Sequence, residues 1–587
     1  MPQRIFLVII SPMRRTYALL ALFLLALACR MPVLSPAPTA TWTPLPPTLT
    51  ETLPPPTLTP LPTLTFTPTS PPPTATSTLA ATLAVPDNAF SLQYHPDGGL
   101  YVGDLVSLSV ISAPGMELSE ASVTAQVDDS SQTLATFDFG SWGIGGRSQA
   151  TLIWGWDTRG LSTGEHTLTF TVQPQGYSWA ETVTLLSAES LPPRQATAQW
   201  ASRQTACCVI HYITNTAVER DIDTLAAMVE QQAQEAIGQM GIGFSDPIVI
   251  NILPRLLGHG GFAADEISVS YLDRNYAANS WDMVVHHEMA HILDGRSGGD
   301  LRPSLLVEGL AVYLAGGHYK PEPLMLRAAA LLEERLNMYL PLAPLADDFY
   351  ASQHEIGYLE GGALVQFLVE TYGWEAFSGF YRDIHPADSG SQAEAMDAAL
   401  QAHFGFGLDE LESDFLAALQ AQPDDPVWRE DVRLTVRYFD LLRRYQELLD
   451  PSAYFRTAWL LDTRQMRERG IVADYLRHPS APNNLALETL FIASSHYLAT
   501  FHFAEAETYL DAVSMVLDAY QQGATDPLSV HPLAADHLAI SLAVREAGYE
   551  VEGIWMGGDE AYVLASGQEL LLIELHLVRT AGGWQVQ

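Results

Sequence analysis

The stretch Val284-Val285-His286-His287-Glu288-Met289-Ala290-His291-Ile292-Leu293 lies in the middle of a 587-residue chain. On a helix, His287 and His291 are one turn apart, and both imidazoles leave the same face. Two neutral imidazoles at this spacing can bind one zinc ion, and Glu288 beside them can reach a water on the open side of the metal. The apolar residues around the motif predict a buried helix, in which a metal and a carboxylate act strongly. The plainer alternative is a buried His-rich helix that binds no metal.

A second helix with a single acid follows this motif. After a polar, Gly-rich turn at 294–300, residues 303–313 have an apolar helical pattern that contains one carboxylate, Glu308. A buried carboxylate without a partner is costly, and a metal ion is the usual remedy. A short loop between the two helices can bring Glu308 opposite the two histidines. The sequence therefore predicts a zinc site with two His ligands, one Glu ligand and an open fourth position.

The two helices together resemble those of the gluzincin metallopeptidases. The similarity is greatest with the branch whose second helix carries Glu-Gly-x-Ala-x-Tyr, and it covers roughly residues 205–420. The matching residues are Glu308, Gly309, Ala311 and Tyr313. The resemblance implies an α+β domain that binds Zn²⁺ and hydrolyses peptide bonds in a protein or peptide substrate through a zinc-bound water, with Glu288 as proton acceptor. Several gluzincins have a second acid four residues after the ligand Glu. This chain has Val312 there, so the groups that support the ligands must differ.

The segment before the zinc helix has the strand order that precedes this helix in gluzincins. Apolar, β-branched runs predict strands at 209–213, 248–253 and 267–272, and a helix is predicted at 221–240. In the gluzincin fold the edge strand of the sheet holds the substrate backbone by pairing with it. We expect this edge strand to contain the substrate-binding residues Ser268, Val269, Ser270 and Tyr271.

Beyond the second helix, the resemblance implies a Tyr or His that stabilises the tetrahedral oxyanion beside the metal. Tyr358, where a predicted helix over 359–372 begins, is the first choice for this second catalytic residue. The alternatives are His318, His354 and Tyr350, and ordinary packing is the plainer interpretation of each. Another helix is predicted at 323–339.

The first residues of the chain predict export. Basic residues, a short apolar run and small residues before Cys29 describe a secretory signal at 1–29, too short for a comfortable membrane span. Its end resembles a bacterial lipoprotein cleavage box. That resemblance implies a lipid on Cys29 and an extracytoplasmic, membrane-anchored protein, with ordinary secretion as the alternative. Residues 30–88 are almost all Pro, Thr, Leu, Ser and Ala and predict a semi-rigid stalk. The adjacent Cys207 and Cys208 can form a vicinal disulfide or remain buried thiols.

Four further parts are predicted after the stalk, so the expected fold class is multidomain. Alternating strands over 89–190 predict a β-sandwich of immunoglobulin-like plan. Residues 200–423 form the gluzincin-like α+β domain. From 427 to 525 the pattern is helical throughout and includes one pair that resembles a tetratricopeptide unit, too little for a repeat array. Residues 530–587 predict a small α+β module in which strands follow a helix.

The charge of the chain limits its partners. There are 68 acidic residues against 29 Lys and Arg, a formal net charge of −39. This excess excludes a nucleic-acid partner and disfavours anionic surfaces; no feature indicates an oligomeric state. The sequence favours an exported zinc metallopeptidase. The alternatives are a catalytically silent surface-binding lipoprotein and a zinc hydrolase that cleaves a non-peptide amide.

Overall fold

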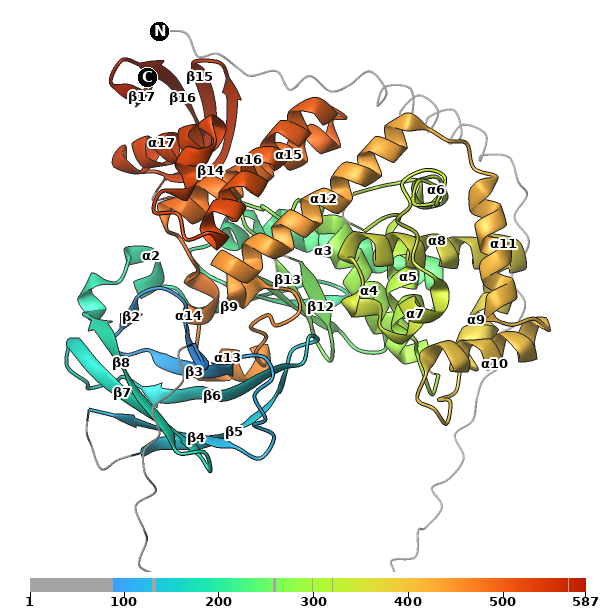
Figure 1. Cartoon of the computed structure of the whole chain (residues 1–587), viewed down its shortest axis with the longest axis horizontal. Helices are drawn as coiled ribbons and strands as arrows, with labels where there is room; N and C mark the ends of the chain where they lie inside the picture. The colour runs from blue at the N-terminus through green and yellow to red at the C-terminus, as the bar shows by residue number, and fades with distance from the viewer. Residues whose placement is uncertain (1–87, 129–132, 257–259, 298, 319, 568) are drawn as a thin grey trace, which may run out of the picture. The chain divides into compact units, whose positions relative to one another are not determined.

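The computed structural model describes residues 88–128, 133–256, 260–297, 299–318, 320–567 and 569–587, so Cys29 and the predicted stalk lie outside the described residues. The described chain contains a β-rich N-terminal part, a mixed sheet with helices, a long helical region and a small C-terminal antiparallel sheet (Figure 1). Within this part of the chain, no helix is long and apolar enough to cross a membrane.

The N-terminal part is one eight-stranded sheet that curls around its own core. Its strands are β1 (Phe90–His95), β2 (Leu100–Tyr101), β3 (Leu105–Ser112), β4 (Ser122–Val127), β5 (Thr133–Trp142), β6 (Arg147–Asp157), β7 (Gly164–Gln173) and β8 (Tyr177–Leu186). Strand β5 pairs with β4 along its first half and with β6 along its last four residues, so it joins the two halves of the sheet. Leu108 from one half and Phe170 from the other are fully buried in the same apolar cluster. The predicted alternating strands are confirmed, because alternate side chains of β4 and β7 enter this core.

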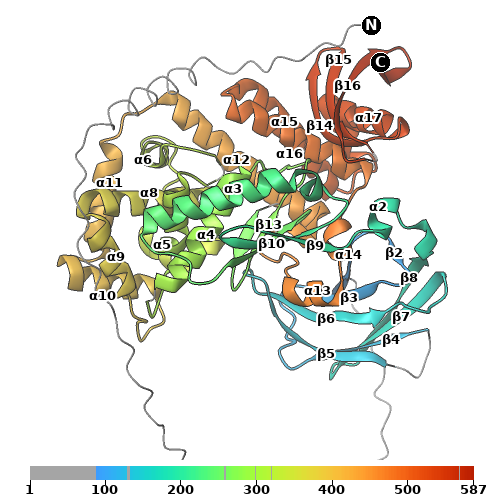
Figure 2. The same cartoon turned by 180° about the vertical axis from the view of Figure 1, so that it is seen from behind.

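The mixed sheet has the strand order β12-β13-β11-β10-β9. The strands are β9 (Trp200–Gln204), β10 (Cys208–Ile213), β11 (Ile248–Leu253), β12 (Gly261–Ala263) and β13 (Ile267–Ser270). The three predicted strands are confirmed; they are the central strands, and they run parallel. Helix α3 (Ala217–Met240) packs on this sheet and beside the zinc-motif helix, as Figure 2 shows.

The prediction that Ser268 to Tyr271 form the edge of this sheet is wrong. Strand β12 adds to the outside of β13, with Gly261 opposite Val269 and Ala263 opposite Ile267. The residues of β13 are therefore buried and paired on both sides. Two adjacent glycines gave the β12 segment the pattern of a loop, because glycine is depleted from strands. The exposed edge belongs to β12.

Two helices carry the predicted metal ligands. They are α4 (Trp281–Ser297) and α5 (Ser304–Ala315), and α5 packs against α8 (His354–Tyr372). The contact between α5 and α8 is made by glycines. A Cβ atom on Gly309 would lie 2.4 Å from the carbonyl oxygen of Gly361. Glycine at the position after Glu308 thus lets the two helix backbones touch, which fixes the depth of Glu308.

The helix predicted at 323–339 is much shorter in the structure. Helix α6 (Leu324–Ala329) ends early, and the backbone N–H groups of Met338 and Tyr339 both donate to the carbonyl of Leu331. This compact loop includes Asn337 in a left-handed conformation, with φ of 55°. The remaining helices of this part are α7 (Leu342–Asp347), α9 (Trp374–Arg382), α10 (Gln392–Phe404) and α11 (Leu408–Gln420).

The region after 425 is not helical throughout. Helix α12 (Pro426–Leu449) is followed at 450–481 by mostly irregular chain with two short helices, α13 (Thr463–Arg469) and α14 (Ala473–Leu476). The next helix begins at Pro482. The segment packs against other parts of the chain: Trp459 stacks on His95 with ring centres 3.6 Å apart, and Met466 shares an apolar cluster with Leu253. The prediction was wrong here because these contacts come from distant segments of the chain.

The helices and strands predicted after this segment are confirmed. The expected helix pair is α15 (Pro482–Ala499) and α16 (Phe503–Gln521), and α17 (Pro532–Glu546) precedes the last sheet. That sheet is an antiparallel meander of β14 (Glu550–Gly557), β15 (Glu560–Ser566), β16 (Leu572–Thr580) and β17 (Gly583–Val586).

We expect Gly309→Ala to destabilise the protein by about 1–3 kcal/mol, because the added methyl group overpacks the α5–α8 contact. Glu308 should move with the helix, so zinc affinity should fall as well. Gly238→Ala is the matched control. Gly238 lies inside α3, and no atom lies within 4 Å of the place that an added methyl group would take, so alanine should leave stability unchanged or raise it by up to about 1 kcal/mol. Urea unfolding of both variants checks this, and equal midpoints would contradict the tight helix contact.

Candidate metal centre

Helices α4 and α5 bring His287, His291 and Glu308 together. Glu308 Oε2 lies 3.1 Å from His287 Nε2 and 3.3 Å from His291 Nε2, and the three ligand atoms lie within 4.8 Å of one another. Ligand bonds of about 2.1 Å at tetrahedral angles separate neighbouring ligand atoms by about 3.4 Å. The donor set and its spacing therefore fit a zinc ion, and the group can hold a metal.

The charges in this group are arranged as ligands require. Burial lowers the pKa of His287 to about 4, so this imidazole is neutral at physiological pH. Burial also acts to lower the pKa of His291, but the charge of Glu308 outweighs it and raises that pKa to about 9. Burial alone would raise the pKa of Glu308, but the positive charge of His291 and the hydrogen bonds from both histidines hold it well below its usual value. Without a metal, the group therefore carries one proton, on His291.

Tyr350 and Asp294 lie around the ligands. The hydroxyl of Tyr350 donates to Glu308 Oε1 at 2.5 Å and leaves Oε2 facing the histidines. Asp294, three residues after His291 on α4, is 2% exposed and accepts hydrogen bonds from Tyr381 and Arg302. Its other oxygen, Oδ1, has no hydrogen-bond partner in the described part of the chain. Tyr350 thus orients the ligand Glu308, and Asp294 adds a buried acid on the ligand helix.

Glu288 lies beside the ligands and is 4% exposed. Its Oε2 has no hydrogen-bond partner among the residues that the structure describes, and burial raises its pKa to about 8. A bound cation would lower that pKa. Strand β12 approaches so closely that a Cβ on Gly261 would lie 3.0 Å from Glu288 Oε1. Because Glu288 also lines the cavity described next, its carboxylate can exchange a proton with a molecule there.

A cavity of about 80 Å³ opens beside this centre. It is lined by the following residues: Gly260, Gly261, Ala277, Asn279, Val284, His287, Glu288, His318, His354, Tyr358, Phe439, Arg443 and Phe455. The structure thus brings Tyr358 and two of its alternatives to the same cavity as Glu288. The fourth candidate, Tyr350, is bonded to Glu308 instead.

Tyr358 and His318 lie in parallel, with their ring centres 4.1 Å apart. The ring of Tyr358 is centred 6.2 Å from that of His287, and its hydroxyl makes no hydrogen bond within the described residues. His318 Nδ1 lies 3.1 Å from Glu355 Oε2, which fixes the orientation of the imidazole. Both side chains are placed to donate to a group beside the metal centre.

The neighbouring His286 has a structural role. It is 3% exposed, and its two ring nitrogens contact the side-chain oxygens of Gln232 and Gln239 on α3 at 2.8 Å. These contacts hold α4 against α3, and the adjacent His287 leaves the helix about 100° further round.

The polar atoms of the predicted substrate strand are occupied by the protein itself. Ser270 donates from both its backbone and its hydroxyl to the carbonyl of Gly260, and Tyr271 donates to Asp221 at 2.8 Å. Ser268 Oγ accepts a hydrogen bond from Asn251. On this side of the cavity the exposed backbone is that of Gly260 and Gly261.

Three cavity residues come from beyond the predicted domain boundary and were missed in the sequence. Phe439 and Arg443 lie on α12, and Phe455 lies in the irregular segment after it. The helical periodicity of α12 could have indicated that Arg443 differs from the other arginines. Arg433, Arg437 and Arg444 share one face and pair with acids of α16, whereas Arg443 is about 100° away from Arg444 around the helix.

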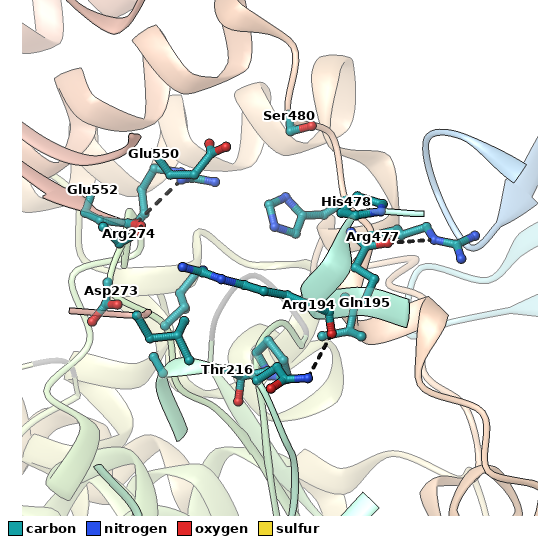
Figure 3. A pocket seen from close by; sticks show the side chains of 18 of the residues that line it. Arg194, Gln195, Thr216, Asp273, Arg274, Arg477, His478, Ser480, Glu550 and Glu552 are labelled. Atoms are coloured by element: carbon teal, nitrogen blue, oxygen red, sulfur yellow. Dashed lines mark hydrogen bonds and ion pairs between the residues drawn. The ribbon is translucent and has the colours of Figure 1, made fainter. Parts of the chain in front are cut away.

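A larger cavity, of about 730 Å³, lies apart from this centre (Figure 3). Arg194 and His478 point into it from one side, and Arg274 and Glu552 line the other. Arg274 is bonded to Glu488, and Arg477 at its margin is bonded to Asp104. Neither the metal group nor Glu288 lines this cavity.

Comparisons with known proteins add no assignment. The chain matches no protein-family model and no curated protein.

We expect wild-type protein to bind one zinc ion and Glu308→Ala to lose it, whereas Glu288→Gln keeps it. Zinc must displace the His291 proton at any pH below about 9, the pKa of that imidazole. Apparent zinc affinity should therefore fall about tenfold for each pH unit from pH 9 down toward pH 4, where His287 also takes up a proton. Metal analysis and a competition titration with a chelator measure both effects. Zinc retained by Glu308→Ala would contradict the assignment.

Proposed function

We propose that this protein is a zinc-dependent metallopeptidase of the gluzincin type. The observation that carries the proposal is the position of Glu288, a buried carboxylate with an unbonded oxygen that lines one cavity with the ligand His287. A structural zinc site is normally closed by a fourth protein ligand and needs no such carboxylate beside it.

Each nearby group then has a role. Zinc held by His287, His291 and Glu308 supplies Lewis acidity and makes water a stronger acid. Glu288 takes a proton from the attacking water and passes it to the leaving amine. Tyr358 donates from its hydroxyl to the carbonyl oxygen, which becomes an oxyanion when water adds to the carbonyl carbon.

The substrate backbone is proposed to pair with β12, the edge strand beside Glu288. This strand is three residues long and is paired on one side only, to β13. Its unpaired side can receive an extended peptide by β-augmentation. A non-glycine residue at Gly261 would bring its Cβ within 3.0 Å of Glu288, so glycine keeps this approach open.

We expect zinc-loaded protein to cleave members of a random peptide library and Glu288→Gln to cleave none, although it retains zinc. Tyr358→Phe should lower kcat by on the order of a hundredfold with little change in KM, because its hydrogen bond forms fully only in the transition state. Mass spectrometry of the digests and single-peptide kinetics measure these outcomes. If Tyr358→Phe keeps its kcat while His318→Gln loses it, the donor is His318.

The same digest tests the two alternatives. If the protein leaves the peptide library intact but hydrolyses simple acyl amides, it is a non-peptide amidase. A protein whose cellular phenotype survives Glu288→Gln is a surface-binding protein with a silent metal site. The free oxygen of Glu288 favours an enzyme over this last alternative.

We also propose that the protein works outside the cytoplasm, anchored by a lipid on Cys29. The proposal rests on the signal-like first residues and the Pro/Thr-rich segment after them. The disulfide between Cys207 and Cys208, at the start of β10, supports an oxidising compartment.

Cys29→Ser should move the protein from the membrane fraction to the soluble exported fraction, because the thiol that would carry the lipid is gone. Cell fractionation with immunodetection measures this change. Unchanged fractionation would show that Cys29 is not the anchor.

A further inference from the structure

An arginine without an acidic partner lies at the end of the candidate catalytic cavity. Four arginines elsewhere are buried, and each is bonded to a carboxylate; they are Arg255, Arg274, Arg327 and Arg477. Arg443 is partly buried on α12 and has no carboxylate within 4 Å among the described residues. Arg147 is also partly buried and has only glutamine partners in the described part of the chain, but Arg443 lines the cavity beside Glu288, where a substrate group can supply the carboxylate.

The neighbours of Arg443 hold it in place without neutralising it. It donates to Gln446 Oε1 at 2.8 Å and to His354 Nε2 at 3.1 Å, and its guanidinium lies 5.0 Å from the ring centre of Phe455. Arginine can only donate, so His354 accepts and is neutral. Burial and the charge of Arg443 keep the pKa of His354 well below its usual value. Two of the five guanidinium N–H groups are used, and the full positive charge remains.

The position of Arg443 links the metal centre to a second cavity. A space of about 190 Å³ shares His354, Tyr358, Arg443 and Phe455 with the cavity beside Glu288. The ring of His354 lies 4.8 Å from that of Tyr358, which in turn lies next to His287. A peptide whose scissile bond lies at the metal therefore has its next groups within reach of the guanidinium.

We propose that Arg443 binds a carboxylate of the substrate on one side of the scissile bond, so that the protein prefers peptides with a carboxylate at that position. The inference rests on the proposed function. The planar guanidinium matches a carboxylate in two parallel hydrogen bonds, and the low-dielectric wall of aromatic residues strengthens them. The carboxylate is either the C-terminus of the peptide or the side chain of an Asp or Glu residue. The first makes the protein a carboxypeptidase, and the second makes it an acid-specific endopeptidase.

Binding to zinc-loaded Glu288→Gln protein, which holds peptides without turnover, tests the proposal by calorimetry. Four probes are compared: Ala-Ala-Phe-Ala as free acid, the same peptide as its amide, and two amides that end in Glu or in Gln. We expect one carboxylate probe to bind at least tenfold more tightly than its neutral partner. Arg443→Met in this background should abolish that difference, and Arg443→Lys should keep part of it. Preference for the free acid identifies a C-terminal carboxylate, and preference for the Glu amide identifies a side chain.

Arg444→Met is the matched control, because Arg444 is the next residue on the same helix but pairs with Asp518 on α16 and lines neither cavity. It should leave the difference unchanged. Equal binding of charged and neutral probes, including no binding of any, overturns the proposal, as does an equal effect of Arg444→Met. Tight carboxylate binding without cleavage by wild-type protein would instead refute the peptidase and leave the carboxylate site standing. Cleavage by wild-type protein without preference for a carboxylate probe would refute the carboxylate site and leave the peptidase standing.

Discussion

A carboxylate that water cannot reach must be balanced by positive charge, and Glu308 imposes this condition at the centre of the molecule. It is 7% exposed and lies on an apolar helix whose other residues are all uncharged. Its only cationic partner among the described residues is the His291 imidazole, which holds one proton that a metal ion can replace. Helix α4 brings the two histidines to one oxygen of this carboxylate, and the short turn Phe349–Ala351 before α8 brings the Tyr350 hydroxyl to the other.

The metal group was predictable because its information is local. The spacing of His287 and His291 fixes their common face on any helix, and Glu308 stands out as the single charge on the next one. The strands and most helices followed for the same reason, since apolar periodicity records which face is buried. Gly309 belongs to this group too, although the sequence alone does not show that Gly361 is the residue it meets.

What the sequence did not reveal depends on contacts between distant segments. A three-residue strand that begins with Gly261 and follows Gly260 has no periodicity, so the edge of the mixed sheet was assigned to the wrong segment. The irregular chain at 450–481 and the side chain of Arg443 were missed for the same reason. Partners more than 80 residues away set their conformations: His95 contacts Trp459 in the irregular chain, and His354 contacts Arg443. Many of these contacts between distant segments are buried arginine–carboxylate pairs. No local sequence pattern predicts which acid will pair with a given arginine.

Helix α12 belongs to two cores at once. Val432 and Val436 pack with the core around the metal centre, whereas Leu434, Tyr438 and Leu442 pack with α15 and α16. Its buried Asp431 accepts hydrogen bonds from Lys320 and Arg327 in the segment after α5. A recombinant fragment that stops at the polar turn before Pro426 would therefore lack a wall of the cavity and expose apolar surface on the metal-binding part. In evolutionary terms, the two parts would have to be inherited together, because recombination at this turn would separate His287 and Glu288 from the residues of α12 that line the same cavity.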